Sequence, residues 1–183
     1  MKYKVTFLDY WHLSSGLSAG AKLDSMVVRD NDNLPYIPGK TLKGLVREMA
    51  ELTNNYDFVC KCFGSSSDEK DKFYSKEKIV SECYFSNIEI EENTKKTIID
   101  KTLHNQLFDE IASTKIDKNG IAQSGSLREI EVVIPISLFG EIKNIPQEYK
   151  QQMKNSLKKV KRMGLNRNRG LGRCKVEILG EEK

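Results

Sequence analysis

Hydrophobic and polar residues alternate near both ends of the chain. In residues 2–7 every second side chain is apolar, and the same alternation recurs in residues 173–179. A period of two is typical of a strand with one buried face, because successive side chains point to opposite sides. The pattern therefore predicts a first and a last strand, each with one face on a core.

Two other segments have apolar residues three and four positions apart, which is the spacing of an amphipathic helix. The first follows Pro38-Gly39, and we expect Thr41 to cap its first turn. Its stripe consists of Leu42, Leu45, Val46, Met49 and Leu52. The second begins near Pro146, carries lysines on its other face and is expected to end at Gly164.

Two β-rich segments lie between these helices. Residues 78–90 are apolar but alternate imperfectly, whereas residues 129–139 alternate cleanly. Both are predicted to be strands. Pro135 has no N–H to donate to a ladder, so we expect the second of them to be an edge strand or to bulge there.

The predicted order, β-α-β-β-α-β, is that of an α+β, ferredoxin-like fold, which is also the fold of RRM-like RNA-binding modules. We expect a single domain over residues 1–183, with insertions at about 14–33, 65–76 and 91–127. Long loops in small domains usually carry function or are disordered. Asn119-Gly120 lies between short apolar flanks in the last insertion and predicts a protruding β-hairpin.

Composition places the chain among soluble globular proteins. Hydrophobic residues make up 38% and charged residues 31%, and no apolar run approaches the length of a membrane span. We expect a cytoplasmic protein with no membrane partner. The net charge of +4 is small, but residues 150–175 contain ten basic and no acidic side chains. Such a local concentration attracts phosphates, although a solvated helix face has the same composition.

The four cysteines lack the spacing of disulfide or zinc frameworks, and a cytoplasmic chain would keep them reduced. We interpret them as packing residues. Cys60, Cys62 and Cys83 could supply three thiolates to zinc, but no nearby histidine completes the set.

Basic residues cluster at the start of the first predicted helix. Lys40, Lys43 and Arg47 share one face near its N-terminus, where unpaired backbone N–H groups favour anions. Gly44 on the same face would let the backbone of a ligand come close. An ordinary amphipathic helix with exposed basic residues is the alternative interpretation.

A second candidate phosphate site is the segment from Gly164 to Gly172, here named the glycine-rich loop, which joins the basic helix to the last strand. Its glycines permit close backbone approach. The residues that we expect to bind a phosphate chain are Arg167, Arg169, Gly170, Gly172 and the adjoining Arg173. A helix C-cap with solvent-facing arginines is the alternative.

These two segments carry a resemblance. Pro38-Gly39-Lys-Thr-Leu-Lys-Gly44-x-x-Arg47 resembles a signature of the RAMP superfamily of CRISPR-associated proteins, and the glycine-rich loop is similar to the loop of that superfamily. Within it, Leu23-Asp24-Ser25 with Leu34-Pro-Tyr-Ile-Pro38 resembles the repeated backbone subunits of type III effector complexes. The resemblance covers roughly residues 1–64 and 125–180.

That resemblance implies a subunit that binds CRISPR RNA and target RNA, together with copies of itself and other effector subunits, and whose hairpin interrupts guide–target pairing. It also implies metal-dependent cleavage of target RNA by an aspartate, which is Asp24 by position in the motif. A carboxylate can hold Mg²⁺ or another divalent cation, which stabilises charge on a phosphodiester. Asp30 and Asp32 are alternatives, although aspartates beside asparagines are often turn formers.

His12 supports a rival hypothesis, because an imidazole can take the proton of a 2′-hydroxyl as a general base. The chain would then be a stand-alone endoribonuclease that processes CRISPR RNA. A third possibility is a structural subunit that makes the same RNA contacts without cleavage. Trp11 next to His12 is expected to pack in the core rather than stack on a base.

Overall fold

The computed structural model describes residues 1–18 and 23–180, and it has the α+β fold that the sequence predicts. The strands are β1 (Lys2–Phe7), β2 (Tyr84–Phe85), β3 (Phe108–Ser113), β4 (Arg128–Val133), β5 (Ser137–Lys143) and β6 (Cys174–Ile178). The α-helices are α1 (Gly39–Glu51), α2 (Tyr56–Phe63), α3 (Glu92–Asp100) and α4 (Lys150–Lys159). Short 3₁₀ turns are η1 (His104–Leu107) and η2 (Gln147–Tyr149).

The central element is a four-stranded antiparallel sheet in the order β2-β5-β1-β6. Strand β1 lies in the middle, with Val5 opposite Leu138 of β5 and opposite Val176 of β6. Strands β1, β2, β5 and β6 are the first to fourth strands of this sheet along the chain. Their spatial order is therefore 2-3-1-4, which is the strand order of a ferredoxin-like fold. The fold class is therefore confirmed.

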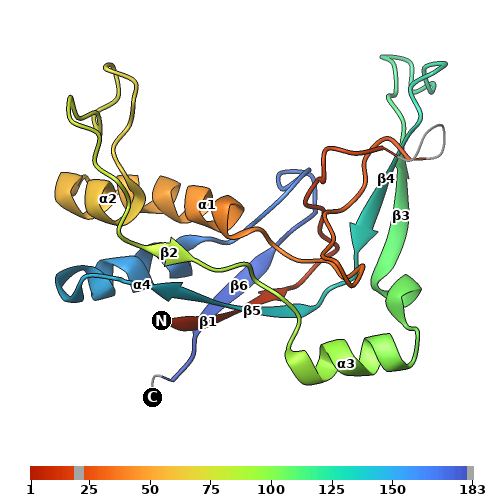
Figure 1. Ribbon diagram of the computed structural model, residues 1–183. Helices are drawn as coiled ribbons and strands as arrows, with labels where there is room; N and C mark the ends of the chain where they lie inside the picture. Colours follow the sequence, from red (N-terminus) through yellow and green to blue (C-terminus); the bar gives the residue numbers. More distant parts are fainter. Residues whose placement is uncertain (19–22, 181–183) are drawn as a thin grey trace.

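Helices α1 and α2 lie over one face of this sheet, and α4 packs beside α1 (Figure 1). The alternation in β1 places Tyr3, Val5 and Phe7 under them, all fully or almost fully buried. The helices contribute Leu42, Val46, Ala50, Met153 and Leu157 to the same core. Burial of this apolar stripe is the main stabilisation of the two-layer arrangement.

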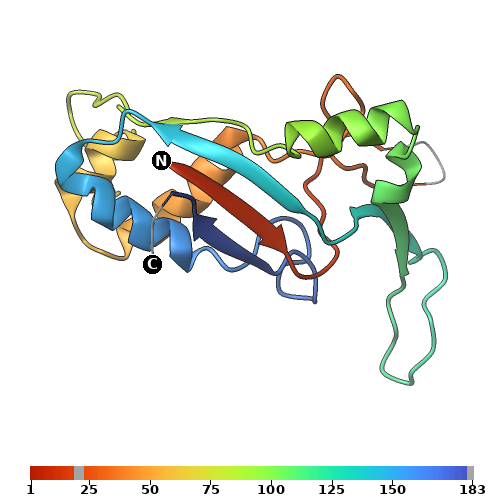
Figure 2. The same cartoon turned by 90° about the horizontal axis from the view of Figure 1, so that it is seen from below.

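The opposite face of the sheet has no helix over its strands β5, β1 and β6, which face the viewer in Figure 2. Its side chains are mostly charged. In register, Lys2 lies opposite Glu141, and Lys4 lies opposite Glu177. The exposed aromatic platform of an RRM-like module is therefore replaced here by alternating charges, with Phe139 as a half-buried aromatic residue among them.

Strands β3 and β4 form a separate two-stranded hairpin that stands away from the main sheet (Figure 1). Beyond the ladder the hairpin continues to a turn, where Ile116 pairs with Ala122 and Gly120 adopts a φ of 81°. The Gly120 N–H donates to the Asp117 carbonyl oxygen at 3.1 Å. The turn expected at Asn119-Gly120 is therefore present.

The predicted strand over residues 129–139 is wrong as a single element. The chain leaves β4 at Val133, turns at Pro135 and enters β5 at Ser137, so its two halves belong to different sheets. Pro135 has no N–H for a ladder, and Ile134 donates instead to the Leu107 carbonyl oxygen at 3.0 Å. The alternating pattern continues through this break because both halves have one buried face.

Other boundaries also differ. Helix α1 begins at Gly39 with Pro38 at the N-cap and no side-chain cap, so the predicted capping role of Thr41 is wrong. The last helix ends at Lys159 rather than at Gly164. Residues 78–90 contain only the short β2, and the sequence pattern did not predict α2 or α3. The single domain over residues 1–183 and its three insertions stay predictions.

Among the described residues, no helix has both the length and the apolar character that crossing a membrane requires.

Candidate nucleic-acid interface

Helix α1 begins against the sheet. A β-carbon at Gly39 would collide with the carbonyl oxygen atoms of Phe85 and Ser86, so glycine lets the first turn approach the edge strand. The Gly39 N–H donates to Asn87 Oδ1 at 3.0 Å. This contact fixes the helix start, and with it the direction in which the following side chains point.

The outer surface of α1 has two flanks. Because successive helix residues are rotated by about 100°, Lys40, Lys43 and Arg47 fall on one flank, while Leu45 and Glu48 fall on the other. Gly44 lies between them at the exposed crest, with no described atom within 4 Å of a β-carbon built there. A glycine inside a helix costs about 0.5–1 kcal/mol relative to alanine, and packing does not explain it here.

Of the three predicted basic residues, Arg47 makes hydrogen bonds within the protein and Lys43 is partly buried. Arg47 Nε donates to Glu51 at 2.8 Å, and Arg47 Nη1 donates to the Gly64 carbonyl oxygen at 3.1 Å. Partial burial lowers the pKa of Lys43. The charge of Arg47 lowers this pKa further, whereas the electrostatic effect of Cys83 raises it. A phosphate near Lys43 would favour the charged ammonium that burial disfavours. Lys40 is exposed.

The glycine-rich loop is held by the segment between β1 and the first long loop. The Gly172 N–H donates to the Tyr10 carbonyl oxygen at 2.8 Å, and the Leu165 N–H donates to the His12 carbonyl oxygen at 2.8 Å. A β-carbon at Gly172 would collide with the Met163 carbonyl oxygen, and one at Gly164 with that of His12. These two glycines serve contacts between backbone segments of the protein itself.

Other residues of the loop face outward. Arg167, Arg169 and Gly170 are exposed, and nothing described lies within 4 Å of a β-carbon at Gly170. Arg173 differs, because its guanidinium forms two hydrogen bonds to the carboxylate of Asp9, at 2.9 and 3.0 Å. Arg173 is therefore the predicted phosphate ligand with a carboxylate partner, although its side chain is also exposed.

A groove of about 340 Å³ runs between α1 and this loop. Its lining residues are Leu45, Glu48, Met49, Lys159, Val160, Lys161, Arg162, Arg167 and Asn168. Arg167 is thus brought next to α1, but on the flank opposite Lys43 and Arg47. The sequence interpretation named neither Lys161 nor Arg162 as a site residue, although both lie in the basic run at 150–175.

Asp24 is exposed and lies beside the start of β4, at the end of the β3–β4 ladder that leads to the hairpin turn. Its Oδ2 accepts a hydrogen bond from the Glu129 N–H at 2.9 Å, and its own N–H donates to the Glu129 carbonyl oxygen at 2.9 Å. These bonds anchor the aspartate to the start of β4. The structure does not bring Asp24 into contact with the basic flank of α1.

His12 has no exposed surface. Its Nδ1 lies within hydrogen-bond distance of the Glu131 carbonyl oxygen, and its Nε2 lies 3.0 Å from Ser25 Oγ. Both ring nitrogens therefore have partners within the protein. Trp11 is also fully buried and stacks on Phe7 with ring centroids 4.4 Å apart, which confirms the packing interpretation.

Asp30 and Asp32 form a turn rather than an open site. Asp30 Oδ1 accepts from the backbone N–H groups of Asp32 and Leu34, each at 2.9 Å. Lys95 of α3 pairs with both carboxylates, at 3.2 and 2.6 Å, and they raise its pKa. These contacts support the turn-forming interpretation of the two aspartates.

Among the described residues, no group of three or more His, Cys, Asp or Glu side chains gathers to hold a metal ion. Asp24 offers one exposed carboxylate, which is compatible with Mg²⁺ only where water and phosphate supply the other ligands. Cys62 and Cys83 are buried, and a hydrogen bond between the two thiols raises the pKa of Cys62 and lowers that of Cys83.

Comparison with known proteins places this geometry in a family. A family model described as the RAMP superfamily matches residues 4–175. The chain belongs to the RAMP superfamily. The predicted resemblance is thereby confirmed, and α1 and the glycine-rich loop both lie inside the matched range. No curated protein matches the chain.

Solved structures share the RAMP fold of this chain. A chain of Type III-B Cmr-beta in the apo state aligns with a TM-score of 0.72 at 13% identity, covering 98% of this chain and 97% of its own length. A chain of Type III-B Cmr-beta bound to cognate target RNA aligns with a TM-score of 0.70 at 13% identity, covering 96% and 95%. At this identity the likeness shows the fold.

Proposed function

We propose that this RAMP protein is an RNA-binding backbone subunit of a type III CRISPR effector complex and that Asp24 cleaves guide-paired target RNA. Membership of the superfamily and a likeness to a chain of Type III-B Cmr-beta bound to cognate target RNA support the setting. The partners would be CRISPR RNA, target RNA, further copies of this chain and other effector subunits.

The observation that carries RNA binding is the exposed Gly44 between the basic flank of α1 and the groove that Arg167 lines. A nucleic-acid backbone that crosses α1 at Gly44 meets Lys40 and Lys43 on one side and Arg167 on the other. Arginine and lysine neutralise phosphates there, and the absent side chain at Gly44 allows close approach. Arg47, which is largely covered and bonded to Glu51 and Gly64, then positions the surface more than it neutralises phosphates, whereas the exposed Arg173 can reach a phosphate if it leaves Asp9.

Cleavage is assigned to Asp24 because it combines exposure with a fixed position. Its two hydrogen bonds to the backbone of Glu129 hold this residue beside the start of β4, and the resemblance implies cleavage by this aspartate. A divalent cation bound there would stabilise charge that develops on the phosphodiester. Asp24 would hold the cation and orient it toward the phosphate, and the Glu129 N–H would hold the carboxylate in position.

The rival assignment to His12 has less support. A general base must come within hydrogen-bond reach of the proton that it removes. His12 is fully buried and both of its nitrogens have partners, so a ribose hydroxyl has no direct path to the ring. A structural subunit without cleavage remains the alternative that the experiment below separates.

The test is cleavage of a labelled target RNA by the reconstituted guide complex with Mg²⁺. We expect Asp24→Asn to lower the cleavage rate by about 100-fold or more while RNA binding is retained, because the amide keeps the size but not the charge. Asp109→Asn, at an exposed hairpin aspartate, is the matched control. If Asp24→Asn cleaved at the wild-type rate, catalysis by this residue would be excluded. If neither the wild type nor the variants cleaved the RNA, the chain would be a structural subunit.

A further inference from the structure

One buried residue, His12, contacts three segments around the candidate site. Its carbonyl oxygen accepts a hydrogen bond from the Leu165 N–H of the glycine-rich loop at 2.8 Å. Its ring nitrogen Nδ1 contacts the Glu131 carbonyl oxygen of β4, and Nε2 lies 3.0 Å from Oγ of Ser25, the residue after Asp24. The loop that we expect to bind phosphates and the segment that carries Asp24 are therefore joined through a single residue.

The partners of the ring set the direction of its hydrogen bonds. A carbonyl oxygen only accepts, so Nδ1 of His12 carries the hydrogen that it donates to Glu131. In the neutral ring Nε2 is then an acceptor, and the Ser25 hydroxyl donates to it. Ser25 Oγ also lies 3.1 Å from Ser14 Oγ, whose hydroxyl can donate to it in turn. The Ser25 hydroxyl is therefore held on two sides.

The segment that carries Asp24 is a short addition to the β3–β4 ladder. Ser25 lies opposite Ile130 in an isolated parallel bridge, and the Glu131 N–H donates to the Ser25 carbonyl oxygen at 3.1 Å. Short stretches of backbone pairing next to exposed residues open more easily than long ladders. The hydroxyl of Ser25 gives this segment an additional contact, with the fully buried ring of His12.

His12 has no exposed surface, so it can influence cleavage only through the position of other residues. Ser25 follows Asp24 along the backbone, and a displacement of Ser25 therefore displaces the carboxylate as well. Loss of a group that orients a cation-holding side chain typically lowers activity about 10- to 100-fold. The contact with Leu165 uses the backbone of His12, so a change in the ring contact with Ser25 leaves the loop in place.

We propose that His12 is a positioning residue, which sets the place of the Asp24 carboxylate relative to the glycine-rich loop and to β4. The ring takes no proton from the RNA and does not touch it. It holds the Ser25 hydroxyl, and through Ser25 it holds Asp24. The effect on cleavage rests on the proposed function, because it assumes that Asp24 cleaves RNA, whereas the effect on the segment itself can be measured without cleavage.

Amide hydrogen exchange of the full chain labelled with ¹⁵N tests the hold on the segment. Ser25→Ala removes the hydroxyl that contacts the ring. We expect exchange at the Asp24 and Glu131 N–H groups to become about fivefold to tenfold faster, because their hydrogen bonds join this segment to β4. Exchange at the Leu165 N–H should stay unchanged, because its partner is the backbone of His12.

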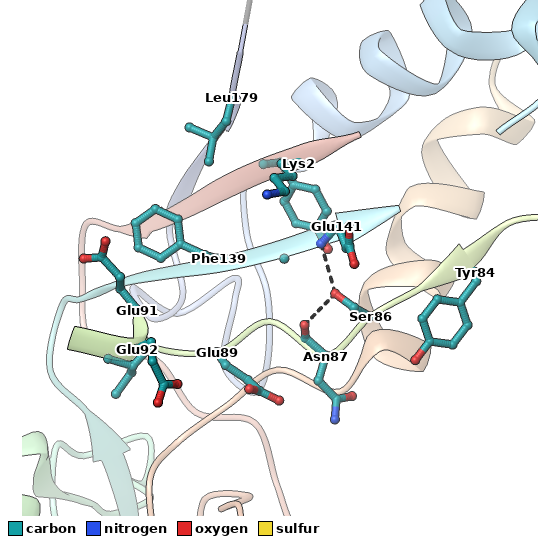
Figure 3. A pocket seen from close by; sticks show the side chains of 13 residues that line it. Lys2, Tyr84, Ser86, Asn87, Glu89, Glu91, Glu92, Phe139, Glu141 and Leu179 are labelled. Carbon is teal, nitrogen blue, oxygen red and sulfur yellow. Dashed lines mark hydrogen bonds between the residues drawn. The ribbon is translucent and has the colours of Figure 1, made fainter. Parts of the chain in front are cut away.

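Ser86→Ala is the matched control. The Ser86 hydroxyl also has two hydrogen bonds, from the Glu141 N–H at 2.9 Å and to the Asn87 carbonyl oxygen at 2.7 Å (Figure 3). It lies in a groove of about 600 Å³ between β1, β5 and the segment 84–92, and neither His12 nor Ser25 lines that groove. Faster exchange at Asp24 in both serine variants, or in neither, would overturn the proposal.

Two substitutions of His12 separate positioning from a general loss of stability. An asparagine amide ends near the place of Nδ1 and can donate to Glu131, whereas a glutamine amide extends to the place of Nε2 and can accept from Ser25. At equal RNA binding by the reconstituted guide complex with Mg²⁺, we expect His12→Asn to cleave about 10-fold more slowly and His12→Gln to stay within about threefold of the wild type. Urea denaturation measures the stability of both variants. Cleavage rates that follow stability rather than the contact with Ser25 would overturn the positioning role.

The two measurements also separate this inference from the proposed function. No cleavage by the wild-type complex would contradict cleavage by Asp24, and the exchange comparison would then still decide whether His12 holds the segment. Cleavage by the wild type together with unchanged rates in His12→Asn and Ser25→Ala would keep the proposed function and overturn the positioning role.

Discussion

Helix α1 and the glycine-rich loop use glycine for opposite reasons. In the loop, Gly164 and Gly172 allow the protein's own backbone segments to touch, whereas Gly44 of α1 leaves an exposed crest that no described atom covers. Arg169 and Arg173 are both exposed, and Arg173 is in addition paired to Asp9. A motif in this family therefore mixes residues that build the surface with residues that are left for a ligand.

The sharpest test of this division is at Gly172. Gly172→Ala forces a β-carbon into the Met163 carbonyl oxygen at a positive φ of 70°, so we expect a loss of about 3 kcal/mol or more in the free energy of unfolding. Gly170→Ala, at a φ of 93° in open space, should cost about 1 kcal/mol. Urea denaturation measures both, and equal losses would contradict the division.

Arg47 and Lys40 provide the corresponding test on α1. Arg47→Ala removes hydrogen bonds to Glu51 and to the Gly64 carbonyl oxygen, so we expect it to cost about 1–2 kcal/mol of stability. Lys40→Ala should leave stability within about 0.5 kcal/mol but reduce the slope of log affinity against log salt by about one. RNA binding over a salt series, alongside denaturation, separates the two roles. A loss of stability at Lys40 would contradict its outward role.

Gly44→Ala is expected to move stability and binding in opposite directions. Alanine in the helix interior should add about 0.5–1 kcal/mol to the free energy of unfolding. The added methyl group occupies the crest that we assign to the RNA backbone, so affinity should fall. Urea denaturation and RNA binding are measured on the same variant. Unchanged RNA affinity would contradict the proposal that the RNA backbone crosses α1 at Gly44.

The smallest effect is expected at the sheet face. Lys175→Ala removes an exposed lysine that pairs with Glu177 at 2.8 Å, so stability should change by less than about 1 kcal/mol. RNA affinity and its salt dependence should stay unchanged, because our proposal assigns the phosphate contacts to α1 and the glycine-rich loop. A reduced salt slope in this variant would place RNA on the sheet side and remove the contrast with α1.

The sequence predicted the elements whose periodicity is clean, which are β1, α1, α4 and β6. It could not separate β4 from β5, because both halves keep one apolar face and only Pro135 marks the change of sheet. It also did not predict α3, a short helix with one buried residue, Ile98. Such a helix depends on tertiary contacts more than on its own pattern.

The sequence predicted which residue types make up the candidate site. It did not predict which of them form ion pairs or hydrogen bonds with distant residues. Arg173 and Asp9 are 164 residues apart, so their ion pair leaves no local signal. The burial of His12 is equally invisible, because its partners Ser25 and Glu131 come from distant segments that the fold brings together.

The central position of β1 has a consequence for how the protein is made. Within the described sheet, residues 2–7 pair only with residues 137–141 and 174–178. The first strand therefore cannot pair until these later strands have been synthesised. Helices α1 and α2 need only local contacts and can form earlier during synthesis. A nascent chain therefore keeps an apolar strand unpaired until late, which favours slow folding and makes that strand a target for chaperones.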